Sequence, residues 1–129
     1  MILGLTIAAT VAVGCGRPQD AGAPGPTRPR SSASVAIREP APGALLSGSR
    51  VRVLVELKGG RVVPQAAALR SDEGHIHITL DGNLISMLSG LEQEVDVTPG
   101  LHLLQVEFAA ADHLPFEPRV VTTVAFTVQ

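Results

Sequence analysis

The sequence predicts an all-β fold, because alternation of apolar and polar residues recurs along it and a helical period does not. From Ser34 to Gln129, short alternating stretches are interrupted about every eight to twelve residues by clusters of Gly, Pro, Ser, Asn and Asp. No stretch in this range keeps apolar residues at a helical spacing for the roughly ten residues that a helix needs. The pattern is typical of a sandwich of short strands.

The residues before Ser34 have a different composition and are expected to lie outside this folded unit. The apolar run from Ile2 to Gly14 has the length of a signal-peptide core and is too short for a membrane span, which takes about 20 residues. Residues 16–33 are rich in Pro, Gly, Ser and Ala, so they are expected to form a disordered spacer. The predicted organisation is a signal peptide at 1–14, a lipidated cysteine with its tether at 15–33, and one domain at 34–129.

Cys15 is the candidate lipidation site. The segment Ala12-Val13-Gly14-Cys15 resembles the lipobox at which bacterial lipoprotein precursors are cleaved, and Cys15 is the only cysteine. A lone cysteine in an exported chain has no internal disulfide partner, whereas acyl chains on it would anchor the protein stably. The expected location is the bacterial cell envelope, on its periplasmic or extracellular face, with the protein held to the membrane by its N-terminal lipid. The alternative is an ordinary cleaved signal peptide that leaves a free thiol.

The first half of the domain contains two predicted strands and then a long connection. Residues 34–38 form a short strand, and in residues 50–57 the side chains of Val51, Val53 and Val55 alternate with polar ones and are expected to face the core. Residues 58–73 connect to the next strand, with the alanines at 66–68 as a candidate helical turn. Connections of this length are uncommon unless they are functional or mobile.

A strand at residues 75–80 carries two of the four histidines. Ile76, Ile78 and Leu80 are expected to point inward, so that His75, His77 and Thr79 point outward. Residues 81–83, Asp-Gly-Asn, predict a tight hairpin that pairs residues 83–88 with this strand.

Three further strands are predicted at 92–97, 101–109 and 120–128, with a loop at 110–119 that contains two prolines. On the strand at 101–109 the expected core face is His102, Leu104, Val106 and Phe108. Seven or eight strands in a domain of this length predict an immunoglobulin-like Greek-key sandwich.

Several short motifs carry a family resemblance. Gly74-His75-x-His77, Pro99-Gly100-x-His102-x-Leu104 and Asp112-His113-x-Pro115 together are similar to an uncharacterised group of small exported bacterial domains, many of them lipoproteins. The resemblance covers about residues 39–129. It implies an immunoglobulin-like fold and an envelope location, and it implies no reaction.

His75, His77 and His113 are the candidate metal ligands. In a Greek-key sandwich the loop before the strand at 75–80 and the loop after the strand at 101–109 lie at the same end, which brings these imidazoles near the carboxylates of residues 72, 73 and 112. Such a set suits Cu(II) or Zn(II), and Met87 could add a soft ligand for Cu(I). The alternative is that all three imidazoles have packing and hydrogen-bonding roles. His102 lies at the opposite end of its strand, where immunoglobulin-like domains often carry a tyrosine corner, and it is expected to be structural.

Composition and motifs exclude several functions. The net charge is −2, with 10 Lys and Arg against 12 Asp and Glu and no Trp or Tyr, so nothing predicts binding to nucleic acid. The sequence contains no nucleophile elbow, phosphate-binding loop or zinc-protease motif, so no enzyme activity is expected. The leading hypothesis is a lipid-anchored, non-catalytic binding or interaction module of unknown ligand, for which a protein partner is one candidate. The alternatives are a copper- or zinc-binding protein and an accessory domain that adds an edge strand to a partner.

Overall fold

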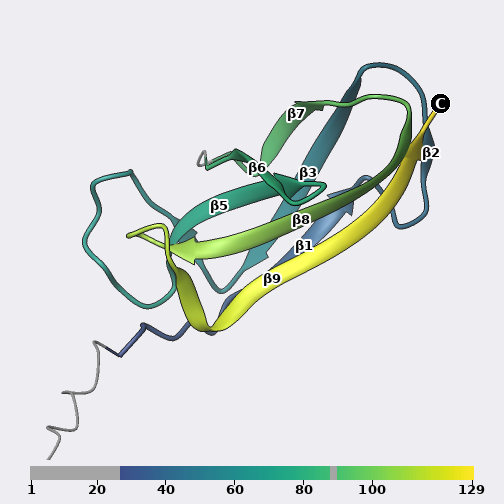
Figure 1. Ribbon diagram of the computed structural model, residues 1–129. Coiled ribbons are helices and arrows are strands. Elements are labelled where there is room, and N and C mark those ends of the chain that lie inside the picture. Colours follow the sequence, from purple (N-terminus) through teal and green to yellow (C-terminus); the bar gives the residue numbers. More distant parts are fainter. Residues whose placement is uncertain (1–26, 88–89) are drawn as a thin grey trace, which may run out of the picture.

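Two β-sheets pack face to face in the computed structural model, which describes residues 27–87 and 90–129 (Figure 1). The smaller sheet has the strand order β1 (Ser34–Glu39), β3 (Arg50–Lys58), β7 (Glu92–Asp96). The larger has the order β2 (Leu45–Leu46), β9 (Pro115–Val128), β8 (Gly100–Ala110), β5 (Glu73–Leu80), β4 (Arg61–Val62), and β6 (Asn83–Ser86) also pairs with β5. The predicted all-β sandwich is therefore confirmed, and the strand order is consistent with an immunoglobulin-like fold. The Greek-key connectivity stays a prediction.

The described residues form strands, turns and loops, and they contain no helix long and apolar enough to cross a membrane. The alanines at 66–68 lie in an irregular segment between β4 and β5, so the helical turn predicted there is absent from this described segment. Cys15 and the predicted signal peptide lie outside the described residues.

Strand β8 is the centre of the larger sheet, because it pairs antiparallel with β5 on one side and with β9 on the other. Its inward residues, as predicted, are His102, Leu104, Val106 and Phe108, all of which are buried. The valines of β3 at 51, 53 and 55 face them from the smaller sheet. The core is thus built mainly of Val, Leu and Ile, with Phe108, Phe116 and Phe126 as its largest side chains.

The loop predicted at 110–119 is much shorter in the structure. β8 continues to Ala110 and β9 begins at Pro115, so only residues 111–114 form the turn. Both prolines are tolerated: Pro115 is the first residue of β9, and Pro118 lies outside the regular ladder, because the β8–β9 pairing passes from Ala109–Pro115 to Phe108–Val120 and leaves out residues 116–119. Phe116, from this irregular part, is fully buried and packs on Phe108, with ring centroids 5.3 Å apart.

The last residues of the predicted tether lie against the domain, which differs from the predicted boundary at Ser34. Arg28 donates two hydrogen bonds to the carboxylate of Asp112, at 2.5 and 2.9 Å, and further bonds to the carbonyls of Leu114 and Pro115. The backbone carbonyl of Pro29 accepts from the N–H of Glu117. We call residues 28–33 the strap, since they run along the domain before β1 begins.

Candidate functional site

The three candidate ligands His75, His77 and His113 lie together on the outer face of the larger sheet, and we call them the histidine cluster. His75 and His77 alternate on β5 with Ile76 and Ile78, which are completely buried between the sheets. The alternation that the sequence predicts therefore holds, and the two imidazoles point away from the core of the sandwich.

These imidazoles are buried all the same, although they point away from the core. His75 has a relative exposure of 0% and His77 of 9%. The covering groups are residues 63–72 and the turn at 111–114, which lie at the same end of the molecule in Figure 1. The Nε2 atom of His75 lies 3.3 Å from the carbonyl oxygen of Pro64, and Val63 donates its backbone N–H to the carbonyl of Gly74. The long connection acts as a cover over the cluster.

His113 reaches the cluster because of the backbone conformation of its turn. Its φ angle is +63°, in the left-handed region that few residues other than glycine adopt. Its N–H donates to the carbonyl of Ala110, which closes the turn. The ring of His113 then stacks on that of His75, with centroids 4.4 Å apart and planes inclined by 16°. The structure thus brings together all three histidines that the sequence analysis gives as candidate metal ligands.

His77 and His113 share a direct hydrogen bond. The Nε2 atom of His77 lies 3.2 Å from Nδ1 of His113, and the two ring planes are inclined by only 13°. One nitrogen must carry the proton and donate it to the lone pair of the other, so at least one ring is neutral on the shared side. Burial and the proximity of His113 lower the pKa of His77, while the nearby carboxylate of Glu107 opposes this effect.

His75 contributes a buried atom with an unused hydrogen-bonding capacity. Its Nδ1 atom is buried, and among the described residues it has no hydrogen-bond partner. An unsatisfied buried polar atom lowers the free energy of unfolding by roughly 1–3 kcal/mol, so such an atom in a folded protein calls for an explanation.

The predicted carboxylates do not complete a ligand set. Asp72 accepts hydrogen bonds from Ser31 and Ser32 of the strap, and Glu73 pairs with Arg61. The Arg28 guanidinium lowers the pKa of Asp112 to about 2. In residues 27–87 and 90–129, no group of three or more His, Cys, Asp or Glu side chains is arranged so that it could hold a metal ion. Met87 follows β6 with an exposed side chain.

His102 occupies a separate position at the far end of β8. Its Nδ1 atom lies 2.7 Å from the carboxylate of Asp81, and its Nε2 atom lies 2.6 Å from the carbonyl of Thr98. The other carboxylate oxygen of Asp81 accepts the N–H of Leu103. Both imidazole nitrogens thus face acceptors, and the bonds to Thr98 and Asp81 raise the pKa of His102. This arrangement links the turn before β8 to the hairpin after β5.

Exposed apolar side chains also lie on the outer face of the larger sheet, among polar ones at residues 79, 105, 123 and 127, and they were not singled out from the sequence. Leu101 and Leu103 project from β8 opposite Thr127 and Ala125 of β9, and Leu101 is 76% exposed. Leu45, Leu84 and Val121 add exposed side chains at register positions on the same face. The sequence did contain a signal for these side chains. Alternation on β8 points residues 101 and 103 away from the core, and both are leucine. We call these five residues the apolar face.

Charges on this face are neutralised within the domain. Glu107, which lies opposite His77 on the neighbouring strand, is buried and makes two bonds of 2.7 Å to the guanidinium of Arg119. Asp81 is bonded to His102. A surface that binds at the apolar face would therefore meet little unbalanced charge.

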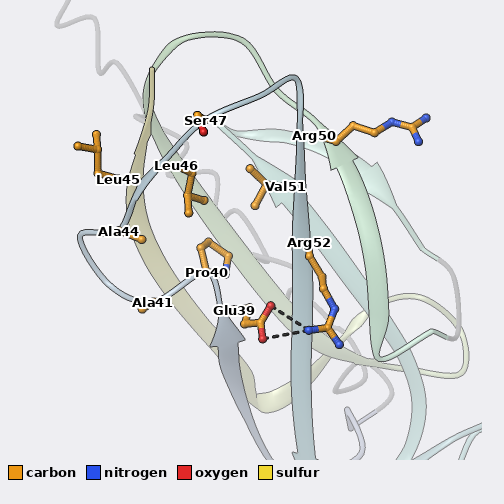
Figure 2. Close-up of a pocket in the computed structure, with 10 residues that line it drawn as sticks. All are labelled: Glu39, Pro40, Ala41, Ala44, Leu45, Leu46, Ser47, Arg50, Val51 and Arg52. Carbon is orange, nitrogen blue, oxygen red and sulfur yellow. Dashed lines mark hydrogen bonds and ion pairs between the residues drawn. The ribbon is translucent and has the colours of Figure 1, made fainter.

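An open groove of about 530 Å³ lies where the chain passes from β1 to β2 (Figure 2). Figure 2 shows that Arg52 reaches the carboxylate of Glu39 across one end of the groove, whereas Arg50 points away from it. The lining contains no histidine, and its one carboxylate is paired, so the groove offers no group for acid–base or metal chemistry.

Comparisons with known proteins add little. No family of known proteins matches this sequence, and no curated protein is significantly similar to it. A crystal structure of an engineered protein has a similar backbone, with a TM-score of 0.47 and 15% sequence identity, over 75% of this chain and 20% of the other. This chain therefore spans about a fifth of that protein, and a similarity at this level says nothing about function.

Proposed function

We propose that this protein is a lipid-anchored, non-catalytic binding module of the bacterial cell envelope, with an immunoglobulin-like fold. The observation that carries the binding role is the apolar face. Five exposed large apolar side chains lie on one side of one sheet, and a surface of that kind on a single domain marks an interaction site.

The partner that fits this face is another envelope protein with an apolar, uncharged docking surface. The carboxylate of Glu107 is neutralised by Arg119, and that of Asp81 is hydrogen-bonded to His102 and to the N–H of Leu103, so the face offers little free charge for a charged partner to pair with. A lipid anchor on Cys15 would hold the domain at a membrane, where it meets neighbours in the same membrane.

The anchor is tested by substitution of the cysteine. Mass spectrometry of the mature protein is expected to find acyl chains on Cys15 as its first residue, and Cys15→Ser is expected to abolish both acylation and recovery in the membrane fraction. A mature chain that begins elsewhere would refute the anchor.

The binding role is tested by photo-crosslinking in intact cells. A photoreactive residue at position 103 is expected to give a defined adduct, whereas the same residue at Glu94 on the smaller sheet gives none. Leu101→Glu is expected to abolish the adduct, while Leu91→Glu, at an exposed leucine beside the smaller sheet, leaves it intact. The mass of the adduct distinguishes a second copy of this chain from a different protein.

We propose metal binding at the histidine cluster as the second candidate function. The 3.2 Å between His77 Nε2 and His113 Nδ1 is close to the separation of two nitrogens on one tetrahedral zinc ion, roughly 3.3 Å for bonds of about 2.0–2.1 Å. The unpartnered Nδ1 of His75 is a further candidate donor. Because the rings are nearly parallel, their lone pairs lie in separate planes, and the rings must rotate before they share one ion.

Calorimetric titration with Cu(II), Cu(I) and Zn(II) tests this second function. Stoichiometric binding is expected in the unmodified chain and in His102→Asn, and it is expected to be lost in the His75→Ala/His113→Ala double variant. Weak binding that the double variant retains would leave the cluster as a packing element.

A further inference from the structure

The arginines of this domain are unevenly paired. Six of the eight arginines among the described residues form ion pairs with carboxylates of the domain, at positions 28, 38, 50, 52, 61 and 119. Arg30 and Arg70 are exposed and have no carboxylate partner in the part of the chain that the structure describes. The two unpaired guanidinium groups are therefore the free cations of this part.

Both of these arginines lie at one end of the molecule. The side chain of Asp72 accepts hydrogen bonds from Ser31 and Ser32, which joins residues 63–72 to the strap. Arg30 directly precedes Ser31 in the strap, and Arg70 lies two residues before Asp72. The contact between the strap and residues 63–72 thus brings the two cations to the same region. We call this end, made of residues 28–33, 63–72 and 111–114, the tether pole.

Exposed leucines accompany the cations at the tether pole. Leu69, next to Arg70, is 49% exposed, and Leu114, whose carbonyl accepts from Arg28, is 54% exposed. Neither residue belongs to the apolar face. Leucine beside arginine is the composition that favours the boundary between lipid headgroups and acyl chains.

The chain enters the domain at this same pole. Arg28 is fixed by its fork on Asp112 and by two carbonyls of the turn at 111–114. Only eleven residues lie between Cys15 and Thr27, the first described residue, and the twelve steps from one to the other span at most about 40 Å. A lipid on Cys15 would therefore keep the tether pole within about 40 Å of the membrane.

We propose that the tether pole docks on an anionic lipid surface, with Arg30 and Arg70 on the headgroups and Leu69 and Leu114 inserted beside them. This inference rests on the proposed lipid anchor and adds a second, non-covalent contact to it. Residues 28–33, 63–72 and 111–114 contain three arginines against the carboxylates of Asp72 and Asp112, a net charge of +1. The carboxylate of Glu117, whose backbone N–H bonds to Pro29, lies outside these residues but close to the strap, so the contact rests on the two free guanidinium groups and not on a large net charge. The long axis of the domain is then roughly perpendicular to the membrane, and the apolar face points along the membrane plane toward neighbouring proteins.

The test uses the full acylated chain reconstituted into vesicles of phosphatidylcholine with phosphatidylglycerol. A fluorophore is attached at Ala68→Cys in the tether pole or, as the matched reference, at Ala125→Cys near the far end of β9, both exposed alanines. Spin-labelled lipids are expected to quench the fluorophore at position 68 and to leave the one at 125 unaffected. Thermal unfolding of both labelled chains verifies that they are folded.

Charge variants identify the contact as electrostatic. An anionic surface contributes about 1 kcal/mol for each arginine near it, or roughly fivefold in a binding constant. Arg30→Gln/Arg70→Gln is therefore expected to weaken docking about 25-fold, and pure phosphatidylcholine vesicles are expected to weaken it similarly. Arg50→Gln, which removes a paired arginine of the smaller sheet, is expected to leave docking unchanged.

Two results would overturn the inference, and they differ in what else they overturn. If the chain floats with the vesicles but the fluorophore at position 68 is no more quenched than that at 125, the pole does not dock, although the anchor stands. If the unlabelled chain fails to float with vesicles, the lipid anchor is wrong and the docking proposal fails with it.

Discussion

A glycine decides how closely the strand of the histidine cluster approaches its neighbour. A Cβ atom at Gly74 would lie 1.8 Å from the carbonyl oxygen of Ala109 and 2.8 Å from its carbonyl carbon. Gly74 pairs with Ala110 beside the irregularity at Phe108 and Ala109, where β8 leaves its regular register with β9. Because the obstruction is backbone, no rotation of a side chain can relieve it.

Gly74→Ala is expected to lower the free energy of unfolding by about 3 kcal/mol, since β5 and β8 must separate to admit the methyl group. Chemical denaturation measures this change. Gly82→Ala is the matched control: its φ is +83° but the space around it is open, so only backbone strain of about 1 kcal/mol is expected. Equal losses in the two variants would contradict this account.

The residue pattern of the cluster was accessible from the sequence, whereas its burial was not. Strict alternation places His75 and His77 opposite Ile76 and Ile78 whatever surrounds them. Their cover comes from residues 63–72, a segment without regular structure whose path depends on a few contacts such as that of Pro64 with His75. The left-handed conformation of His113 is likewise set by its turn, and a lone histidine in a sequence does not signal it.

Strand β8 carries most of the organisation at the level of elements. In the first half of the strand its two faces differ in exposure: Leu104 and Val106 are buried in the core, whereas Leu101 and Leu103 are exposed to solvent. Adjacent leucines on this strand therefore have different roles, which offers a comparison with the chemistry of the side chain held constant.

Leu104→Ala is expected to lower the free energy of unfolding by roughly 3 kcal/mol, because it leaves a cavity between the sheets. Leu103→Ala is expected to change it by less than about 0.5 kcal/mol, since that side chain is largely exposed. Thermal or chemical denaturation of the two variants gives the comparison. A large loss at position 103 would show that the apolar face is covered in the isolated protein.

The strap behaves as an additional element, although it contains no regular structure. Its backbone and side chains bond to β9, to the turn at 111–114 and to Asp72, which are far from it in sequence. Composition alone did not predict that the strap is ordered, because Pro, Gly and Ser are common both in ordered connections and in disordered spacers. The prolines that suggested a long loop at 110–119 misled for a related reason, since Pro115 only begins β9 and Pro118 lies outside the ladder, so neither has to donate an N–H to β8.

A double-mutant cycle measures the fork between Arg28 and Asp112. Arg28→Gln, Asp112→Asn and the double variant are expected to give a favourable but modest coupling free energy, because the pair is two-pronged but partly exposed. Hydrogen exchange of Ala33 and Glu117 is expected to accelerate in both single variants. Unchanged exchange would show that the remaining bonds hold the strap without the fork.

The histidines at the two ends of the molecule have pKa values that are shifted in opposite directions. At the tether pole, burial and a neighbouring histidine lower the pKa of His77, so the folded state favours its neutral form. At the other end, Thr98 and Asp81 raise the pKa of His102, so the folded state favours its charged form. The stabilisation from His77 is present above its unfolded pKa of about 6.5 and is lost as the pH falls below it, whereas that from His102 is present below about 6.5 and is lost as the pH rises through the raised value.

Mild acid is therefore expected to loosen the tether pole and leave the far end intact. NMR titration of the ring protons should find His77 titrating below about 6.5 and His102 above it. Hydrogen exchange at the turn 111–114 should accelerate as the pH falls, once corrected for intrinsic rates, while Leu103 stays protected. His113→Ala should raise the pKa of His77, and indistinguishable titrations of His77 and His102 would contradict the assignment.

The strap also determines how the domain responds when the chain that precedes it is pulled. Without the strap, tension on the N-terminal chain would act first on Ser34 and peel β1 from β3, one backbone bond at a time. With it, the load enters at Arg28 and passes through the Asp112 fork to the turn between the two longest strands, β8 and β9. A protein tethered in this way carries mechanical force through its most extensively bonded hairpin, and its edge strand is shielded from it.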